Sequence, residues 1–128
     1  MHFANITLVI PDYDAAIAFF TEVLGFELVE DTRLSETKRF VRVRPRGGET
    51  ALLLAQPKNA AERAAIGNQT GGRVAFFLHT DDFARDFAAL EAAGVVFRGE
   101  PRTEPYGRVV VFEDPWGNPW DLIQPPLG

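Results

Sequence analysis

Among the side chains of this sequence that could do chemistry, Asp121 has the most unusual setting. It lies in the stretch FEDPWGNPWDLIQP, residues 112–125, among apolar residues of an expected strand. A buried carboxylate is costly unless it is paired or binds something. We expect Asp121 to pair with a cation, either Arg73 or a charge on a ligand. A hydrogen-bonded carboxylate at a wet pocket mouth is the alternative interpretation.

His79 is the second candidate, at the end of the apolar stretch RVAFFLH, residues 73–79. Alternate residues of a strand share a face, so Arg73, Phe77 and His79 are predicted to lie on one face of this strand. Either His79 or Asp121 has the chemistry of a general base. Alternatively, His79 makes only local hydrogen bonds where the strand ends. Trp116 is interpreted either as a pocket lid or as surface packing.

Composition excludes several other functions. The chain has no cysteine, which excludes disulfides, thiolate metal sites and cysteine nucleophiles. The net charge of -5 argues against nucleic-acid binding and suits a cationic ligand. No apolar run is long enough for a membrane span, and no signal peptide is recognisable, so we expect a cytoplasmic protein.

Glu113 and Asp114 form a carboxylate pair, but turn chemistry before Pro115 explains Asp114 better than acid catalysis does.

Hydrophobic periodicity places these residues on a series of strands and helices. Residues 6–10 alternate as in a half-buried strand. A helix follows, with Asp14 as its expected N-cap and Gly25 as its expected C-terminal cap. Residues 26–31, 39–44 and 50–56 are predicted strands. Residues 57–72 are predicted to form a linker with one helical turn.

The same pattern then begins again. Residues 73–79 are a predicted strand, and a helix follows that Asp81-Asp82 begins and Gly94 ends. Residues 95–99, 108–113 and 119–124 are three more predicted strands. The distances from Asp12 to Gly25 and from Asp81 to Gly94 are both 13 positions. This self-similarity indicates a duplicated module, although two unrelated units remain an alternative.

Two β-α-β-β-β modules resemble the vicinal oxygen chelate superfamily, which includes glyoxalase I, extradiol dioxygenases and bleomycin-resistance proteins. The most specific stretches are ITLVIPDYDAAIAFFTEVLGFEL and FEDPWGNPWDLIQ. The resemblance implies an α+β fold in which both modules form a curled mixed sheet around a cavity. It implies one glyoxalase-like domain, residues 1–128, with module 1 at about 4–56, a linker at 57–72 and module 2 at about 73–124. We further expect eight strands, helices near residues 13–24 and 82–93, and a homodimer.

The resemblance also implies where metal ligands would lie. Metal-dependent members use His, Gln and Glu at four positions, which fall here on Asn5, Leu53, Arg73 and Asp121. Leucine cannot bind a metal, and arginine is a permanent cation that repels one. We therefore predict no metal cofactor. A nonstandard site of Asn5, His79 and Asp121, holding zinc, nickel, iron or manganese, is the alternative.

Two functional hypotheses follow. The first is a metal-independent protein that binds a small organic molecule in its sheet cavity. Its predicted ligand-binding residues are Asn5, Arg73, Phe77, His79, Trp116 and Asp121. The second is a metal-assisted lyase, isomerase or dioxygenase with a degenerate site, in which His79 and Asp121 are catalytic. Three departures at four ligand positions favour binding over catalysis.

Overall fold

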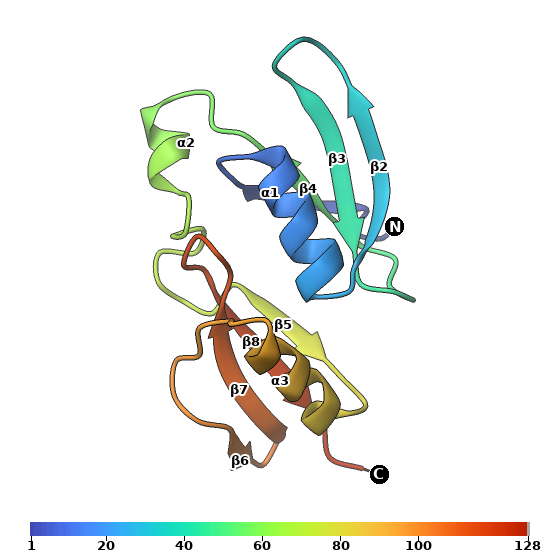
Figure 1. Cartoon of the computed structure of the whole chain (residues 1–128), viewed down its shortest axis with the longest axis vertical. Helices are drawn as coiled ribbons and strands as arrows, with labels where there is room; N and C mark the ends of the chain where they lie inside the picture. Colours follow the sequence, from blue (N-terminus) through green and yellow to red (C-terminus); the bar gives the residue numbers. More distant parts are fainter. Residues whose placement is uncertain (128) are drawn as a thin grey trace. The chain divides into compact units, whose positions relative to one another are not determined.

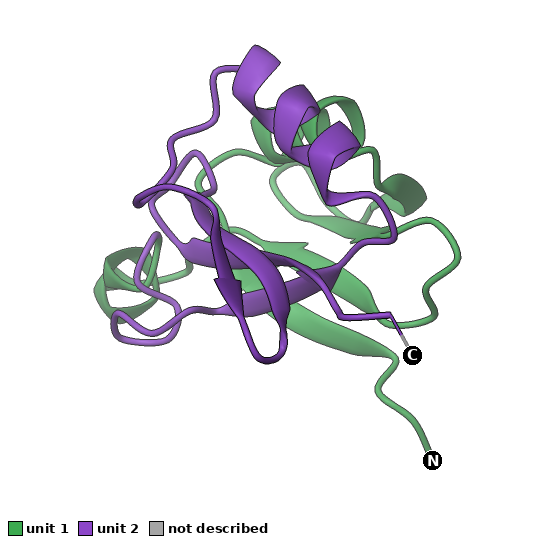
Figure 2. Cartoon of the chain, turned by 90° about the horizontal axis from the view of Figure 1, so that it is seen from below, with its two compact units in different colours: residues 1–66 green, residues 67–128 purple. Residues whose placement is uncertain are grey.

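The structure is a computed structural model that describes residues 1–127. The chain divides into two compact units, of which unit 1 is residues 1–66 and unit 2 begins at Gly67 (Figure 2). The boundary lies inside the predicted linker. Each unit carries one four-stranded mixed sheet with helices, which confirms the expected α+β fold class.

Unit 1 contains β1 (Asn5–Val9), α1 (Tyr13–Ala18), η1 (Phe19–Val23), β2 (Glu27–Arg33), β3 (Arg39–Arg44), β4 (Ala51–Ala55) and α2 (Ala60–Ala64) (Figure 1). The sheet order is β1-β4-β3-β2. β1 runs parallel to β4, while β4, β3 and β2 are antiparallel neighbours. The three strands predicted within residues 26–56 are therefore all present.

One face of this sheet forms the core of unit 1. Its buried residues include Leu8, Ile10, Val41, Val43, Leu52 and Leu54, and the helical segment adds Phe19 and Phe20. Since side chains alternate along a strand, the opposite face carries the residues between them. These include Asn5 and Thr7 on β1, Arg42 on β3 and Leu53 on β4.

The N-cap of the first helix lies two residues earlier than expected. Asp12, and not Asp14, is the N-cap, because its Oδ1 accepts from the backbone N of Ala15 at 2.9 Å. Asp14 instead pairs with Arg39. The helix ends as the π-helical turn η1, and Gly25 follows with a φ of 70°. The sequence gives no sign of the π turn, but the glycine cap is confirmed.

Unit 2 contains β5 (Phe76–His79), α3 (Phe83–Ala92), β6 (Arg102–Glu104), β7 (Gly107–Glu113) and β8 (Pro119–Gln124). The sheet order is β5-β8-β7-β6, with β5 parallel to β8. Asp82 caps α3 by accepting from the backbone N of Arg85 at 3.0 Å. The cap predicted at Asp81-Asp82 is therefore confirmed at its second residue.

Two strand predictions in unit 2 were wrong in their limits. β5 begins at Phe76, because Gly71 and Gly72 have positive φ and Thr70 Oγ1 binds the Arg73 carbonyl, so Arg73 belongs to a turn. Residues 95–99 form only one isolated bridge, between Phe97 and Phe112. The sixth strand is instead β6. No helix in residues 1–127 is both long and apolar enough to cross a bilayer.

Candidate ligand-binding site

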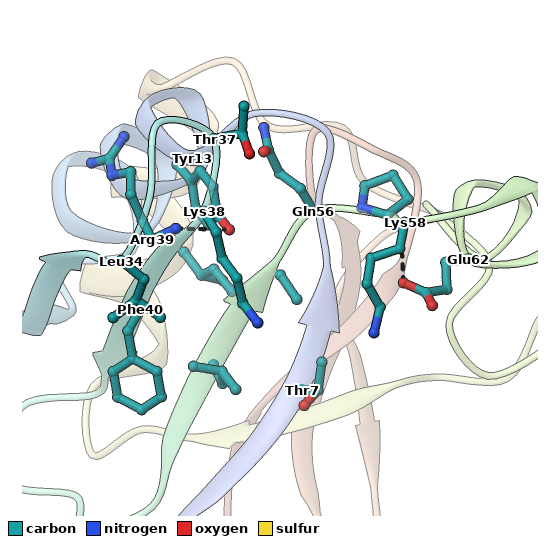
Figure 3. A pocket seen from close by; sticks show the side chains of 14 residues that line it. Thr7, Tyr13, Leu34, Thr37, Lys38, Arg39, Phe40, Gln56, Lys58 and Glu62 are labelled. Carbon is teal, nitrogen blue, oxygen red and sulfur yellow. Dashed lines mark hydrogen bonds between the residues drawn. The ribbon is translucent and has the colours of Figure 1, made fainter.

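Unit 1 contains a pocket of about 620 Å³ whose lining includes Thr7 on β1 and Leu53 on β4 (Figure 3). This volume lies within the range of about 300–1,000 Å³ that is usual for small-molecule sites. The lining residues of most interest are apolar Leu34, Phe40 and Leu53, polar Thr7, Tyr13 and Gln56, and charged Lys38, Arg39, Lys58 and Glu62.

Strands and ordered loops both position this lining. Thr7 and Leu53 are Cα partners in the parallel pairing of β1 with β4. Leu34 and Lys38 lie in the loop between β2 and β3, where the Lys38 carbonyl accepts from the backbone N of Leu34 at 2.8 Å. Lys58 follows β4, and its backbone N donates to Glu62 Oε1 at 3.1 Å. The pocket is therefore formed by backbone that is held in place on each side.

Arg39 holds one wall of the pocket. Its guanidinium donates to Asp31 Oδ2 at 2.7 Å and to Asp14 Oδ1 at 2.9 Å, and its Cζ lies 5.2 Å from the ring centre of Tyr13. The hydrogen bond from Arg39 lowers the pKa of Asp31 below its usual value. Because two carboxylates already bind Arg39, its charge is largely compensated.

A second arginine binds the residue at the first expected metal position. Arg42 Nε donates to Asn5 Oδ1 at 2.7 Å. Since β4 lies between β1 and β3, this side chain reaches across β4 to do so. Arg42 Nη1 also lies 3.9 Å from Glu30 Oε1. The amide oxygen of Asn5 is thus occupied by a cation within the protein.

The side chains at these positions do not fit the metal that the resemblance implies. Asn5 is engaged by Arg42, and Leu53 has no donor atom. In residues 1–127, no three His, Cys, Asp or Glu side chains lie close enough together to hold a metal ion. We therefore assign no metal-dependent step to this chain.

In unit 2, three of the predicted site residues lie on two neighbouring strands. Phe77 on β5 and Asp121 on β8 are Cα partners, and His79 lies two residues further along β5. Phe77 is 62% exposed and His79 is also exposed, whereas Asp121 is only 6% exposed. Trp120 and Leu122 are buried on the other face, as expected.

The expected pairing of Asp121 with Arg73 is not present. No ion pair joins these two residues in the described part of the chain, and Arg73 lies in the turn before β5. Asp121 Oδ1 is buried without a hydrogen-bond partner. Burial raises the pKa of Asp121, and the positive charge of Arg102 opposes that rise. The nearby cation is therefore Arg102, on β6.

The turn before β8 is organised by Asp114. Its Oδ1 accepts from the backbone N atoms of Trp116 and Asn118 at 3.1 and 2.9 Å. Its Oδ2 accepts from Asn118 Nδ2 at 2.9 Å and from Trp120 Nε1 at 3.1 Å. These four bonds confirm that Asp114 stabilises the turn. Trp116 lies within this turn and is half-buried.

None of the six residues predicted to bind a ligand lines the unit 1 pocket, and their role stays a prediction. Thr7 could have been found, because it shares a strand face with Asn5. Lys38 and Lys58 could not, because they lie in a hairpin loop and in the predicted linker, where no period marks the direction of a side chain.

Comparison with known proteins agrees with this architecture. A family model described as Glyoxalase/Bleomycin resistance protein/Dioxygenase superfamily matches residues 2–122. An uncharacterized protein of Shewanella frigidimarina (strain NCIMB 400) is 48% identical over 122 residues, which cover 94% of this chain and 90% of that protein.

Solved structures show the same similarity. TnmS3, an antibiotic binding protein from Streptomyces sp. CB03234, matches with a TM-score of 0.79 and 31% identity over 98% of this chain and 97% of that one. A superfamily member from Sphaerobacter thermophilus DSM 20745 matches with a TM-score of 0.78 and 29% identity over 97% of each chain. This chain therefore belongs to the Glyoxalase/Bleomycin resistance protein/Dioxygenase superfamily.

Proposed function

We propose that this protein binds a small organic molecule without a metal ion, and that the unit 1 pocket is the binding site. The observation that carries the proposal is the pocket itself. Its volume of about 620 Å³ suits a drug-sized molecule, and its lining combines apolar side chains with a few polar ones. The similarity to TnmS3, an antibiotic binding protein, supports binding as the activity.

A pocket-filling substitution tests this proposal. We expect a screen of amphipathic compounds, including glycopeptide antibiotics and glutathione adducts, to give ligands by thermal shift and calorimetry. Leu53→Trp places an indole in the pocket and should weaken binding of each ligand at least about tenfold, since the ligand then meets a steric clash. Leu28→Trp adds the same group at an exposed position outside the pocket and should leave affinity unchanged.

The same ligands also test the binding residues that were predicted from the sequence. Phe77, His79 and Asp121, together with Arg73, Trp116 and Asn5, remain candidates for ligand contact. Binding that survives Leu53→Trp but is lost in Phe77→Ala or Asp121→Ala would move the site to the unit 2 sheet. If no compound binds to the wild-type protein, the proposed function is wrong.

An enzymatic function is the second candidate, favoured by one observation. Asp121 is buried with an unpaired oxygen and a raised pKa, which are properties of many general bases. His79 and Asp121 would then be the catalytic residues. Glyoxalase I turnover of the methylglyoxal–glutathione adduct that is lost in Asp121→Asn would establish this alternative, and we expect no such turnover.

We also propose a homodimer in the cytoplasm, as the resemblance and the absence of cysteine led us to expect. Exposed sheet edges favour pairing with a second copy. Light scattering at micromolar concentration should therefore give about twice the chain mass of 14.2 kDa. A mass equal to that of one chain would contradict this prediction.

A further inference from the structure

We propose that the unit 1 pocket selects an organic anion, whose charged group lies at Lys38 and Lys58 and whose apolar body contacts Leu34, Phe40 and Leu53. This inference rests on the proposed function and adds the chemical class of the ligand. It departs from the cationic ligand that the net charge of -5 suggested.

The distribution of lysine is the first observation. The chain contains only two lysines, Lys38 and Lys58, and both line this pocket. They come from different segments, the hairpin loop between β2 and β3 and the segment after β4. In Figure 3 both side chains extend toward the part of the pocket where Thr7 lies. Two ammonium groups are therefore directed to one pocket of an acidic protein.

The second observation is that neither ammonium group is neutralised. All ion pairs within residues 1–127 use arginine as the cation. The one carboxylate of the pocket, Glu62, accepts from the backbone N of Lys58 at 3.1 Å and from Asn59 Nδ2 at 3.2 Å. Glu62 thus holds the loop and leaves both lysine charges available for a ligand.

The backbone that carries the lysines is ordered. Lys38 donates its backbone N to Ser35 Oγ at 3.0 Å, and its carbonyl accepts from the backbone N of Leu34. On the other side, Gln56 Nε2 donates to the Pro11 carbonyl at 3.1 Å. An anion that enters the pocket therefore has to order two side chains but no loop, which limits the entropic cost of binding.

The third observation concerns the apolar lining. Leu34 is 56% exposed although it is a large aliphatic residue, and it lies in the same loop as Lys38. Phe40 and Leu53 are half-buried on neighbouring strands. An organic anion with a flat apolar body would cover these three side chains while its charge meets the lysines. A small inorganic anion would leave them exposed to water.

Two fluorescent probes that differ by one charged group test the inference. Anilinonaphthalene sulfonate is an aromatic anion, and phenylnaphthylamine has the same ring system without the sulfonate. We expect the wild-type protein to bind the sulfonate more tightly. Lys38→Gln and Lys58→Gln should each weaken sulfonate binding about fivefold, as expected for one exposed ion pair. Binding of the neutral probe should not change, and only sulfonate binding should weaken with salt.

A double variant with equal net charge is the control. Arg46→Gln/Arg63→Gln removes two exposed cations of unit 1 outside the pocket, whereas Lys38→Gln/Lys58→Gln removes two inside it. Only the lysine double variant should lose the preference for the sulfonate over the neutral probe. Lys38→Arg/Lys58→Arg keeps both positive charges and should retain that preference. Equal binding of both probes by the wild-type protein, or equal loss in the two Gln double variants, would overturn the inference.

The same titrations separate this inference from the proposed function. If both probes bind and Leu53→Trp weakens both, the pocket is the site, and charge selectivity alone is in question. If Leu53→Trp affects neither probe, or neither probe binds, the proposed pocket itself is wrong. Reductive methylation with isotope-labelled formaldehyde adds a direct measurement. The Lys38 and Lys58 methyl signals should shift with the sulfonate and not with the neutral probe, and unshifted signals would count against the inference.

Discussion

Asp121 is a buried acidic residue whose burial is only partly compensated, by the positive charge of Arg102. Its Oδ1 has no hydrogen-bond partner, and burial raises its pKa while Arg102 lowers it. A buried carboxylate with a raised pKa favours folding only in its protonated form. The free energy of unfolding should therefore fall as the pH rises from the pKa of Asp121 in the unfolded chain through its higher pKa in the folded protein.

We expect Asp121→Asn to stabilise the protein by about 1 kcal/mol at pH 7, because the amide removes a buried charge at nearly constant shape. The gain should disappear at acid pH, below the ordinary carboxyl pKa of 3.8. Urea denaturation at several pH values measures this difference. Glu100→Gln, at an exposed position, serves as the control for loss of one charge. A destabilised Asp121→Asn at neutral pH would indicate that Asp121 has an unrecognised partner.

Asp114 presents the opposite case, a buried carboxylate that four donors satisfy. Asp114→Ala leaves those donors without an acceptor, and each unpaired buried group is costly, so we expect a loss of about 3 kcal/mol or more. Asp114→Asn should lose less because one acceptor oxygen remains. Tryptophan emission during denaturation measures both, since Trp116 and Trp120 bind this carboxylate. Equal stability of Asp114→Ala and wild type would contradict the described network.

At the scale of elements, the turn before β8 depends on a close backbone approach. Gly67 has a φ of +73°, and a Cβ added there would lie 1.9 Å from the Trp116 carbonyl oxygen. Gln69 then donates its backbone N to Asn118 Oδ1 at 3.1 Å. The segment that begins unit 2 is thus packed directly on the turn that Asp114 organises.

We expect Gly67→Ala to destabilise the protein by several kcal/mol, because the methyl group overlaps backbone that cannot easily move. Gly71→Ala is the matched control, since Gly71 has a similar φ of +72° but nothing within 4 Å of its added Cβ. That control should lose only about 1 kcal/mol from backbone strain. Thermal denaturation compares the two, and equal losses would show that contact at Gly67 is unimportant.

At the scale of the whole molecule, residues 1–127 contain no group of His, Cys, Asp and Glu side chains suited to hold a metal ion, which predicts a low metal content. Protein expressed in metal-supplemented medium and purified without chelator should carry well under one equivalent of zinc, nickel, iron or manganese. The reason is that Arg42 occupies Asn5 Oδ1, while Leu53 and Arg73 cannot act as ligands. Elemental analysis measures this content. Stoichiometric metal that is lost in His79→Ala or Asp121→Ala would contradict it.

The net charge of the whole molecule does not describe the charged residues that line the unit 1 pocket, which are Lys38, Arg39, Lys58 and Glu62. In the folded chain, carboxylates form ion pairs with arginines such as Arg39 and Arg85. Among the ion pairs of the described residues none involves a lysine, and both lysines line the unit 1 pocket. The net charge is a sum over all charged residues, so it does not show which of them are paired. Only the positions of the side chains in space show this.

The sequence by itself determined the duplicated order of strands and helices, the glycine caps and the orientation of residues along each strand. These features depend on local periods and local hydrogen bonds, which the order of residues specifies directly. The face shared by Phe77 and Asp121 could be predicted for this reason. The start of β5 was harder to predict. Arg73 was expected in this strand, but it follows two glycines with positive φ, Gly71 and Gly72, and lies in the turn before β5.

Only the tertiary structure decided which charges meet and where the pocket lies. Arg102, and not Arg73, is the cation near Asp121, since strand order brings β6 and β7 to the side of β8 away from β5. The pocket joins a hairpin loop to the segment after β4, and neither has a period that orients Lys38 or Lys58. Contacts between segments distant in sequence depend on chain topology, which local patterns do not encode.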